Sequence, residues 1–526
     1  MYVNKRVIVF LSILSLSLST LLIPANAAAK AGAKCNKAGI TSVASGKTYT
    51  CVKSGKKLVW NKGVSKSNNS GNLGRDWASV RSTDSGFINE YNGWMAYEKD
   101  LSGKLGEIQS AYINHVGASG MYRIAKYQLG ASRPTTTLSS ISSDLPINQC
   151  QISDPPNRSA ATGFPNLRSS NFRDHINSVK VPGPKMIVQV IPIFAPDSAK
   201  SVKSPGEDYD VYLDFIKSWA EYSSDGESNI QIKVPKNYLP FSKNLATYGL
   251  THMNNFDNPE NIRFANDLIS EVDPAIDFSG TDAVLVVVPP GTQHRVFQQA
   301  VVKDFNTNEG KIKSGMTTTP LTLKGLDQLD DANKRLSNFI VPYWWLHEFY
   351  HAGYGLMDHH GPQGSTDKYG LGEWTLMSGN GGDLSAWEKW ILGFITDSQV
   401  HCLNTTQSQT RWIAPSSVKT NEKKLIVIPI TQTKGIIIES IRPAGLYYKI
   451  PKASNGVLIY VADLDVRDPG LELKLVLPND RNPDQPPTWL SQATLRQGES
   501  VVSNGHKITI VESGTFGDVV KIDKVA

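Results

Sequence analysis

The stretch "WWLHEFYHAGYGLMDHHG", Trp344 to Gly361, decides the fold. His347 and His351 are four residues apart, so a helix places both imidazoles on one face, where they can bind one metal ion. Glu348 follows the first histidine, which places it beside a metal-activated water as that water's general base. The alternative interpretation is an aromatic-rich helix whose histidines only form hydrogen bonds.

A zinc site needs a third protein ligand and an open fourth position. In the metzincin pattern a glycine lies three residues after the second histidine, and the third ligand lies six residues after that histidine. Here Tyr354 and Met357 occupy these two positions. A shift by one residue makes Gly355 the turn glycine and Asp358 the ligand, since glycine tolerates a left-handed helix exit. We expect a wider turn through Gly353 to absorb the inserted residue.

The same insertion rotates the helix exit, which leaves His359 and His360 as rival third ligands. In a second zincin layout the third ligand is a glutamate on a later helix, and Glu373 and Glu388 lie at suitable distances along the chain. We expect Glu373 to lie in a loop. We expect Glu388 to be a surface partner of Lys389.

Two downstream segments fit beneath and beside such a site. In "GEWTLMSGNGG", Gly372 to Gly382, Met377 lies nineteen residues after Asp358, which is typical of the methionine turn under a metzincin metal. An ordinary core methionine is the alternative. "LSAWEKWILGF", Leu384 to Phe394, predicts an amphipathic helix that packs against the site.

Four other polar residues near this region are candidates for supporting roles. Asp367, Asn380 and Asp383 have side chains suited to binding calcium or to supporting the metal ligands, although such residues more often cap loops. Tyr369 is a candidate donor to a developing oxyanion, and simple packing is its alternative role.

Taken together, four segments resemble the secreted immune inhibitor A family of zinc metallopeptidases. They are "LHEFYHAGYGLMD" (346–358), "WTLMSG" (374–379), "LSAWEKWILGF" (384–394) and "GLYYKIPKASNGVLIYVADLD" (445–465). The resemblance covers about residues 180–520. It implies a zincin-like, metzincin-like catalytic domain, a zinc ion, endopeptidase activity and an aspartate as third ligand. The departure from the family is the extra residue before Asp358.

The N-terminus predicts secretion. "MYVNKR" is a basic start, "VIVFLSILSLSLSTLLI" is an apolar run, and "PANA" places Ala25 and Ala27 in the A-x-A pattern of a cleavage site. An uncleaved membrane anchor is the alternative. Because no second long apolar run follows, we expect no transmembrane helix in the mature form, and an extracellular or cell-wall-associated location.

Charge is distributed unevenly along the chain. Residues 1–70 contain eleven Lys or Arg and no Asp or Glu, a charge of +11 against +6 for the whole chain, so the remainder carries −5. A compact basic module in a secreted protein indicates attraction to an anionic cell-wall or surface polymer. A solvated lysine-rich face without a partner is the alternative. Nucleic acid is disfavoured because no recognition motif accompanies the charge.

The four cysteines are expected to form disulfides in an oxidising compartment. Cys35 and Cys51 fall inside the small basic module, which is too short to bury much core, so a bridge between them makes physical sense. Four cysteines allow three pairings. We favour Cys35–Cys51 together with Cys150–Cys402.

These patterns predict an α+β protein with a small N-terminal β-module and an all-β C-terminal domain. The module resembles two-cysteine modules near the N-termini of secreted actinobacterial proteins. The predicted parts are a signal peptide (1–27), the basic two-cysteine module (28–63), a linker (64–74), an N-terminal extension or prosegment (75–150), a zinc metallopeptidase domain (151–402) and a C-terminal β domain (403–526).

Local patterns place the main elements within these parts. Apolar runs predict strands at 185–194, 229–234 and 282–289, and later at 424–430, 435–440, 446–450, 456–464 and 507–512. Helical spacing predicts helices at 93–116, 208–224 and 258–273. In the last of these, Asn258 is the expected N-cap and Pro259 lies in the first turn.

The expected function is a secreted zinc endopeptidase that acts on proteins or peptides. One alternative is an adhesin or cell-wall-binding protein on a catalytically degenerate zincin fold. Another is a zinc hydrolase of peptidoglycan cross-links.

Overall fold

The computed structural model describes residues 30–65 (without 45, 46 and 63), 129–164 (without 156–161), 184–318 (without 251–257, 291, 293–295, 298–299, 303–304 and 313–315), 343–359, 370–478 (without 373, 379–382, 443–444, 448–454 and 467–469) and 493–525. The predicted signal peptide, most of the linker and the predicted helix 93–116 lie outside these ranges. The chain forms two compact units, Met1–Asn72 and Leu73–Ala526, and each is described by itself. Among the described residues, no helix is both long enough and apolar enough to cross a membrane.

The first unit is a small antiparallel sheet closed by a disulfide. Its strands are β1 (Thr41–Ala44), β2 (Lys47–Ser54), β3 (Lys57–Trp60) and β4 (Val64–Ser65), and β2 pairs with the other three. The predicted Cys35–Cys51 disulfide is confirmed, with both cysteines buried. The solvent-exposed lysines described in this unit are Lys30, Lys34, Lys37, Lys53, Lys56, Lys57 and Lys62.

The second unit contains a mixed sheet with helices on both faces. Strand order is β6-β5-β8-β12-β9, and every neighbouring pair is parallel except β12 with β9. These strands are β5 (Lys185–Phe194), β6 (Asn229–Lys233), β8 (Ala283–Val287), β9 (Ala300–Val302) and β12 (Met316–Thr318). The short β7 (Leu239–Pro240) pairs in parallel with the end of β5, and β10 (Phe305–Thr307) pairs with β11 (Gly310–Ile312).

Strand β5 shows why helices cover both faces. Met186, Val188 and Val190 share a core with α5 (Pro205–Ser223) and α8 (Tyr343–Tyr354). Ile191 and Ile193 join the core under α6 (Pro259–Val272) instead. Alternate residues of a strand point to opposite faces, so one apolar run supplies both cores.

Helix boundaries follow local capping signals. The side chains of Ser204 and Glu207 form a capping box at the start of α5. Asn258 accepts the backbone N–H of Asn261 at the start of α6, with Pro259 as the first helical residue. The prediction of Asn258 as N-cap is confirmed.

The C-terminal region is a β-sandwich. One sheet has the order β13-β15-β16-β17-β18 and the other β14-β21-β20-β19. The strands are β13 (Val400–Cys402), β14 (Gln409–Ile413), β15 (Leu425–Pro429), β16 (Lys434–Ile441), β17 (Gly456–Asp463), β18 (Leu473–Leu475), β19 (Ser500–Ser503), β20 (His506–Gly514) and β21 (Gly517–Lys524). Ile426 and Ile438 of the first sheet share a core with Ile508 and Val520 of the second.

The strand predicted at 446–450 is wrong at its first two residues, since Leu446 and Tyr447 lie in a 3-10 helix, Gly445–Tyr447. Residues 448–450 lie outside the described residues. The hydroxyl of Tyr447 donates to the backbone oxygens of Trp374 and Leu384, deep in the unit. A tertiary contact therefore overrides the β propensity of these residues.

The segment 129–155 packs along the sandwich. The predicted Cys150–Cys402 disulfide is confirmed and joins this segment to β13. Asp144 accepts hydrogen bonds from Arg411 at 2.7 Å and from the ring of His401 at 2.7 Å. The described end of the predicted extension is thus tied covalently and electrostatically to the β region.

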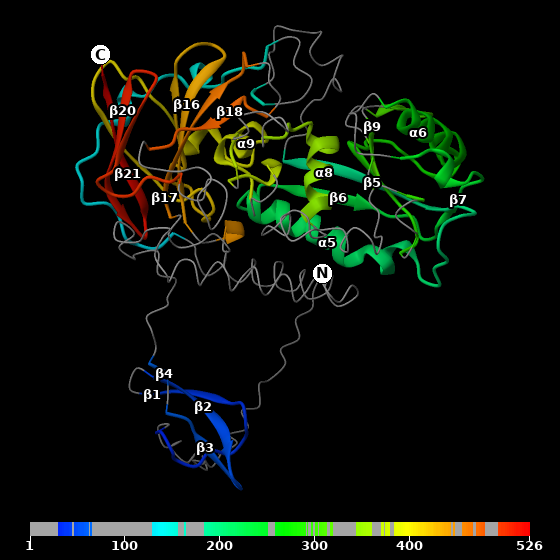
Figure 1. Ribbon diagram of the computed structural model, residues 1–526, viewed down its shortest axis with the longest axis horizontal. Coiled ribbons are helices and arrows are strands. Elements are labelled where there is room, and N and C mark those ends of the chain that lie inside the picture. The colour runs from blue at the N-terminus through cyan, green and yellow to red at the C-terminus, as the bar shows by residue number, and fades with distance from the viewer. Residues whose placement is uncertain are drawn as a thin grey trace, which may run out of the picture. The chain divides into compact units, whose positions relative to one another are not determined.

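Helix α9 (Ala386–Ile391) joins the two halves of the second unit. Trp387 and Trp390 belong to a core with β15 and β16, whereas Leu392 and Phe394 just after the helix belong to the core of α5 and α8. In Figure 1, α8 and α9 accordingly appear between the red C-terminal strands and the sheet around β5. The unit is a mixed α+β fold with an antiparallel C-terminal β region.

Glu439 makes the stability of this junction depend on pH. Its side chain is fully buried in β16 and accepts hydrogen bonds from Ala386 N–H and from the hydroxyl of Tyr460. Burial is the largest influence and raises the pKa of Glu439 from 4.5 to about 7. The folded state therefore holds this proton more tightly than the unfolded state does. The contribution of protonated Glu439 to the stability of the fold is fully present below pH 4.5, and it is lost as pH rises through 7.

We expect Glu439→Gln to flatten this pH dependence. The wild-type free energy of unfolding should fall by up to about 3 kcal/mol more than that of the variant between pH 5 and pH 8. Denaturant unfolding at several pH values measures both slopes. Equal slopes for the two proteins would show that Glu439 does not titrate as proposed.

Candidate metal centre

Helix α8 presents its histidines on the face opposite its apolar side. Leu346, Phe349 and Tyr350 are fully buried in the core with β5 and α5. The side chains of His347 and His351 keep 13% and 12% of their surface exposed. The packed aromatic face thus fixes the rotation of the helix and directs both imidazoles out of the core.

The helix ends at Gly355, as the shifted pattern predicts. Gly355 has φ +69°, and its N–H donates to His351 O at 3.0 Å. Leu356 N–H then donates to Tyr350 O at 3.2 Å, six residues back, which makes a wide exit that accommodates the inserted residue. Gly353 does not form this turn: it stays within α8, where an added Cβ would lie 3.3 Å from Met186 and Phe349.

Three ligand atoms converge just past this exit. Nε2 of His347 and Nε2 of His351 are 3.0 Å apart, and Oδ1 of Asp358 lies 3.2 Å from each. In the described part of the chain, this is the group of His, Cys, Asp and Glu side chains that is arranged to hold a metal ion. The side chain of Asp358 is 40% exposed, so this side of the group lies at the protein surface, while the converging Oδ1 is buried.

The hydrogen bonds of the rings fix which nitrogens can bind a metal. Nδ1 of His347 is 2.9 Å from Leu376 O, and Nδ1 of His351 is 2.7 Å from Leu356 O. A carbonyl oxygen only accepts, so each Nδ1 carries a hydrogen and each Nε2 is left for the metal. Backbone oxygens of this kind orient histidine ligands in many metal sites.

The spacing of the three atoms fits zinc. With bonds of about 2.0–2.1 Å, ligand atoms of a tetrahedral zinc site are about 3.3 Å apart. The separations of 3.0, 3.2 and 3.2 Å are close to this value. Two imidazoles and one carboxylate are also a donor set typical of catalytic zinc, with a fourth position open.

Negative charge dominates the electrostatics of the site. Burial lowers the pKa of His351, but the carboxylate of Asp358 and the charge of Glu348 outweigh it and raise that pKa to about 9. The site therefore attracts a cation, and metal binding must displace a proton from the histidines. Glu348 is partly buried on α8, near enough to His351 to contribute to this charge.

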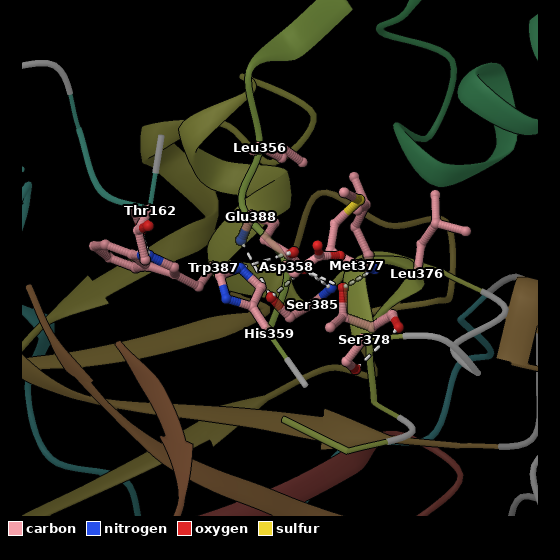
Figure 2. Close-up of polar contacts among 12 residues, drawn as sticks. Thr162, Leu356, Asp358, His359, Leu376, Met377, Ser378, Ser385, Trp387 and Glu388 are labelled. Carbon is pink, nitrogen blue, oxygen red and sulfur yellow. Dashed lines mark hydrogen bonds and ion pairs between the residues drawn. The ribbon is translucent and has the colours of Figure 1, made fainter. Parts of the chain in front are cut away.

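The predicted methionine turn lies against the segments that carry His347 and Asp358. Met377 is fully buried in the 3-10 helix Leu376–Ser378. Leu376 O accepts from His347, and Met377 O accepts from the N–H of His359 at 2.8 Å. The turn thus contacts His347 directly, and it also contacts the neighbour of Asp358. Figure 2 shows Met377 beside His359 and Asp358.

Several alternative ligands lie elsewhere or outside the described residues. His359 is fully buried and faces Glu388 at 3.4 Å, away from the histidine pair. The expected surface pair of Glu388 with Lys389 is wrong, because both side chains are 1% exposed and Lys389 pairs with Asp383. Their burial follows from the position of α9 between two cores.

Asp383 is held by protein partners. Its carboxylate accepts the hydroxyl of Ser223 at 2.6 Å and bonds to the ammonium of Lys389. These contacts explain its placement without calcium. The remaining candidates, His360, Asp367, Tyr369, Glu373 and Asn380, lie outside the described residues.

Sequence reasoning missed the partners that orient the ligands. The two carbonyls that hold the rings belong to Leu356 and Leu376, and every residue offers such an oxygen, so no residue type marks them. Thr375, whose hydroxyl donates to Glu388 at 2.5 Å, was also missed. Its place beside the predicted turn is the one sequence signal that points to it.

No protein-family model matches this chain, and no curated protein matches it either. Function is therefore inferred from the geometry of the metal centre and from the resemblance of its motifs.

Proposed function

We propose that this protein is a secreted zinc-dependent endopeptidase. His347, His351 and Asp358 hold the ion, and Glu348 is the general base. The observation that carries the proposal is the approach of three ligand atoms to within 3.2 Å of one another, with both histidines oriented by backbone carbonyls. A lone histidine–carboxylate pair, such as His401 with Asp144, needs no metal, but here two imidazole nitrogens converge on the same carboxylate oxygen.

Each group of the proposed site has its own chemical role. A zinc ion bound here supplies Lewis-acid polarisation of a substrate carbonyl and acidifies a water molecule. The carboxylate of Glu348 takes a proton from the attacking water and then delivers it to the nitrogen of the leaving amine. Leu376 O and Leu356 O keep Nδ1 of both rings protonated, so the ligand nitrogens stay fixed throughout.

The order of the matched motifs supports a zincin-like catalytic domain of the immune inhibitor A type. The helix with His347 and His351, the turn with Met377 and the helix α9 follow one another in the family's order. The mixed sheet with its antiparallel β9 and the packing of α8 under it agree with that proposal. The two disulfides and the signal-like N-terminus support secretion.

A direct test compares metal content with proteolysis. The purified whole chain should contain close to one zinc ion per molecule and should cleave casein. A zinc chelator should stop cleavage, and added zinc should restore it. A protein that cleaves equally well after its metal is removed would eliminate this mechanism.

The second candidate is a cell-wall-binding protein on a catalytically inert zincin-like scaffold. The exposed lysines of the first unit favour it, because the sequence offers no acidic residue there to neutralise them. Zinc-loaded protein that binds isolated cell walls in low salt but cleaves no member of a peptide library would support this candidate over the first.

A further inference from the structure

A buried carboxylate, that of Glu388, lies behind the metal centre in the first turn of α9. Its exposed fraction is 1%. Oε2 accepts the N–H of Ser385 at 2.8 Å, the hydroxyl of Ser385 at 2.7 Å and the hydroxyl of Thr375 at 2.5 Å. Oε1 faces Nε2 of His359 at 3.4 Å (Figure 2). The two Ser385 contacts belong to the helix cap, and the contacts with Thr375 and His359 lie outside it.

Through Oε1, Glu388 contacts His359, the residue that follows Asp358. His359 donates its N–H to Met377 O at 2.8 Å and accepts the N–H of Leu371 at 2.8 Å. At Gly370 an added Cβ would lie 1.9 Å from His359 O, so the neighbouring segment fits here only without a side chain. Two hydrogen bonds therefore hold the backbone of His359, and its ring lies against the carboxylate of Glu388, which restricts the position of the adjoining Asp358.

Through Oε2, Glu388 contacts Thr375, which lies next to the backbone oxygen that holds His347. Thr375 donates its hydroxyl to Glu388 and accepts the N–H of Met377 at 3.2 Å. That contact shapes the 3-10 turn whose Leu376 O holds Nδ1 of His347 at 2.9 Å. One carboxylate is thus connected to the supports of two of the three metal ligands.

Glu388 is suited to this role because it remains charged. Burial alone raises its pKa, but contact with His359 and the hydroxyls of Thr375 and Ser385 outweigh burial and hold the pKa below its ordinary value. Bonds to an ionised acceptor are about twice as strong as bonds between neutral groups. Charged hydrogen bonds therefore hold Oε2 on the Thr375 side, and an ion contact at 3.4 Å completes the link to His359.

We propose that Glu388 is a positioning residue of the metal centre: through His359 and Thr375 it sets the separation of Asp358 from His347. This inference rests on the proposed zinc function for its effect on catalysis. The link itself is a property of the metal-free protein. Glu388 does not touch the ion or the substrate, so its loss acts through the geometry of the ligands.

The experiment measures zinc affinity of Glu388→Gln in the whole chain. Glutamine keeps the shape but removes the charge and one acceptor. We expect the zinc dissociation constant, from competition with a chromophoric chelator, to rise roughly 10- to 100-fold, as for other residues that orient metal ligands. At saturating zinc, kcat should fall while KM changes little, because the ligand geometry and not the substrate contact is altered.

Three further variants separate positioning from general loss of stability. Thr375→Val should weaken zinc binding as Glu388→Gln does, and Thr375→Ser, which keeps the hydroxyl, should restore it. Glu439→Gln is the matched control: this carboxylate is also buried and also bonds the start of α9, but through Ala386 N–H. It should leave the zinc dissociation constant unchanged.

Hydrogen exchange of the metal-free chain tests the link independently of zinc. In Glu388→Gln the amides of His359 and Met377 should exchange roughly tenfold faster than in wild type, and in Glu439→Gln they should not. Unchanged exchange at both amides overturns the inference, whatever the zinc result. If the wild type binds zinc, an unchanged zinc affinity in Glu388→Gln also overturns the inference. If the wild type binds no zinc but the two amides exchange faster in Glu388→Gln than in wild type, the proposed function is contradicted and the positioning link is supported.

Discussion

Replacing Glu348 with glutamine should lower kcat/KM for peptide cleavage by roughly 100- to 10,000-fold, the usual contribution of a general base. Glutamine has nearly the shape of glutamate but cannot take a proton from water. The helix should be undisturbed, because Glu348 lies on the partly exposed face of α8 and not in its packed aromatic face. The measurement is steady-state cleavage of a fluorogenic peptide.

Zinc content is the control for this variant. Glu348→Gln should bind zinc in the same stoichiometry as wild type, since its carboxylate is not one of the three converging ligands. Zinc-loaded Glu348→Gln that retains more than about a tenth of wild-type activity would remove Glu348 from the mechanism.

Replacing Asp358 with alanine should have the second large effect. We expect the zinc dissociation constant to rise by more than about 1,000-fold, which exceeds the 10- to 100-fold effect of residues that only orient ligands. The reason is that Asp358 supplies the one negative ligand atom, 3.2 Å from each imidazole nitrogen. The chelator competition described above measures this change.

His359→Gln is the comparison that distinguishes the two adjacent residues. Because His359 faces Glu388 and not the histidine pair, its replacement should weaken zinc binding only to the extent expected of an orienting residue. If His359→Gln abolished zinc binding while Asp358→Ala preserved it, the assignment of the third ligand would be reversed.

The sequence predicted those features that local chemistry determines. Asn258 and Pro259 start α6, the β-branched run at 282–289 contains β8, and Gly355 ends α8 at a positive φ. In each case a residue's own conformational preference or the alternation of apolar residues decides the outcome. The Cys35–Cys51 disulfide was predictable because both cysteines lie in one short module, and Cys150–Cys402 then followed as the remaining pair.

Features that depend on distant contacts were not predictable. Tyr447 leaves its expected strand because its hydroxyl reaches Trp374 O and Leu384 O. Glu388 and Lys389 have the composition of an exposed helix, yet both are buried because α9 lies between two cores. The sequence indicates which side chains can bind zinc, but the supports of those side chains arise only from the three-dimensional packing.

The central claim is that His347, His351 and Asp358 hold one zinc ion, and anomalous diffraction at the zinc absorption edge tests it most directly. A crystal of the zinc-loaded protein should show one strong anomalous peak about 2.0–2.2 Å from Nε2 of His347, Nε2 of His351 and a carboxylate oxygen of Asp358. A peak that lacks Asp358 among its neighbours, or the absence of any peak beside the two histidines, would contradict the claim.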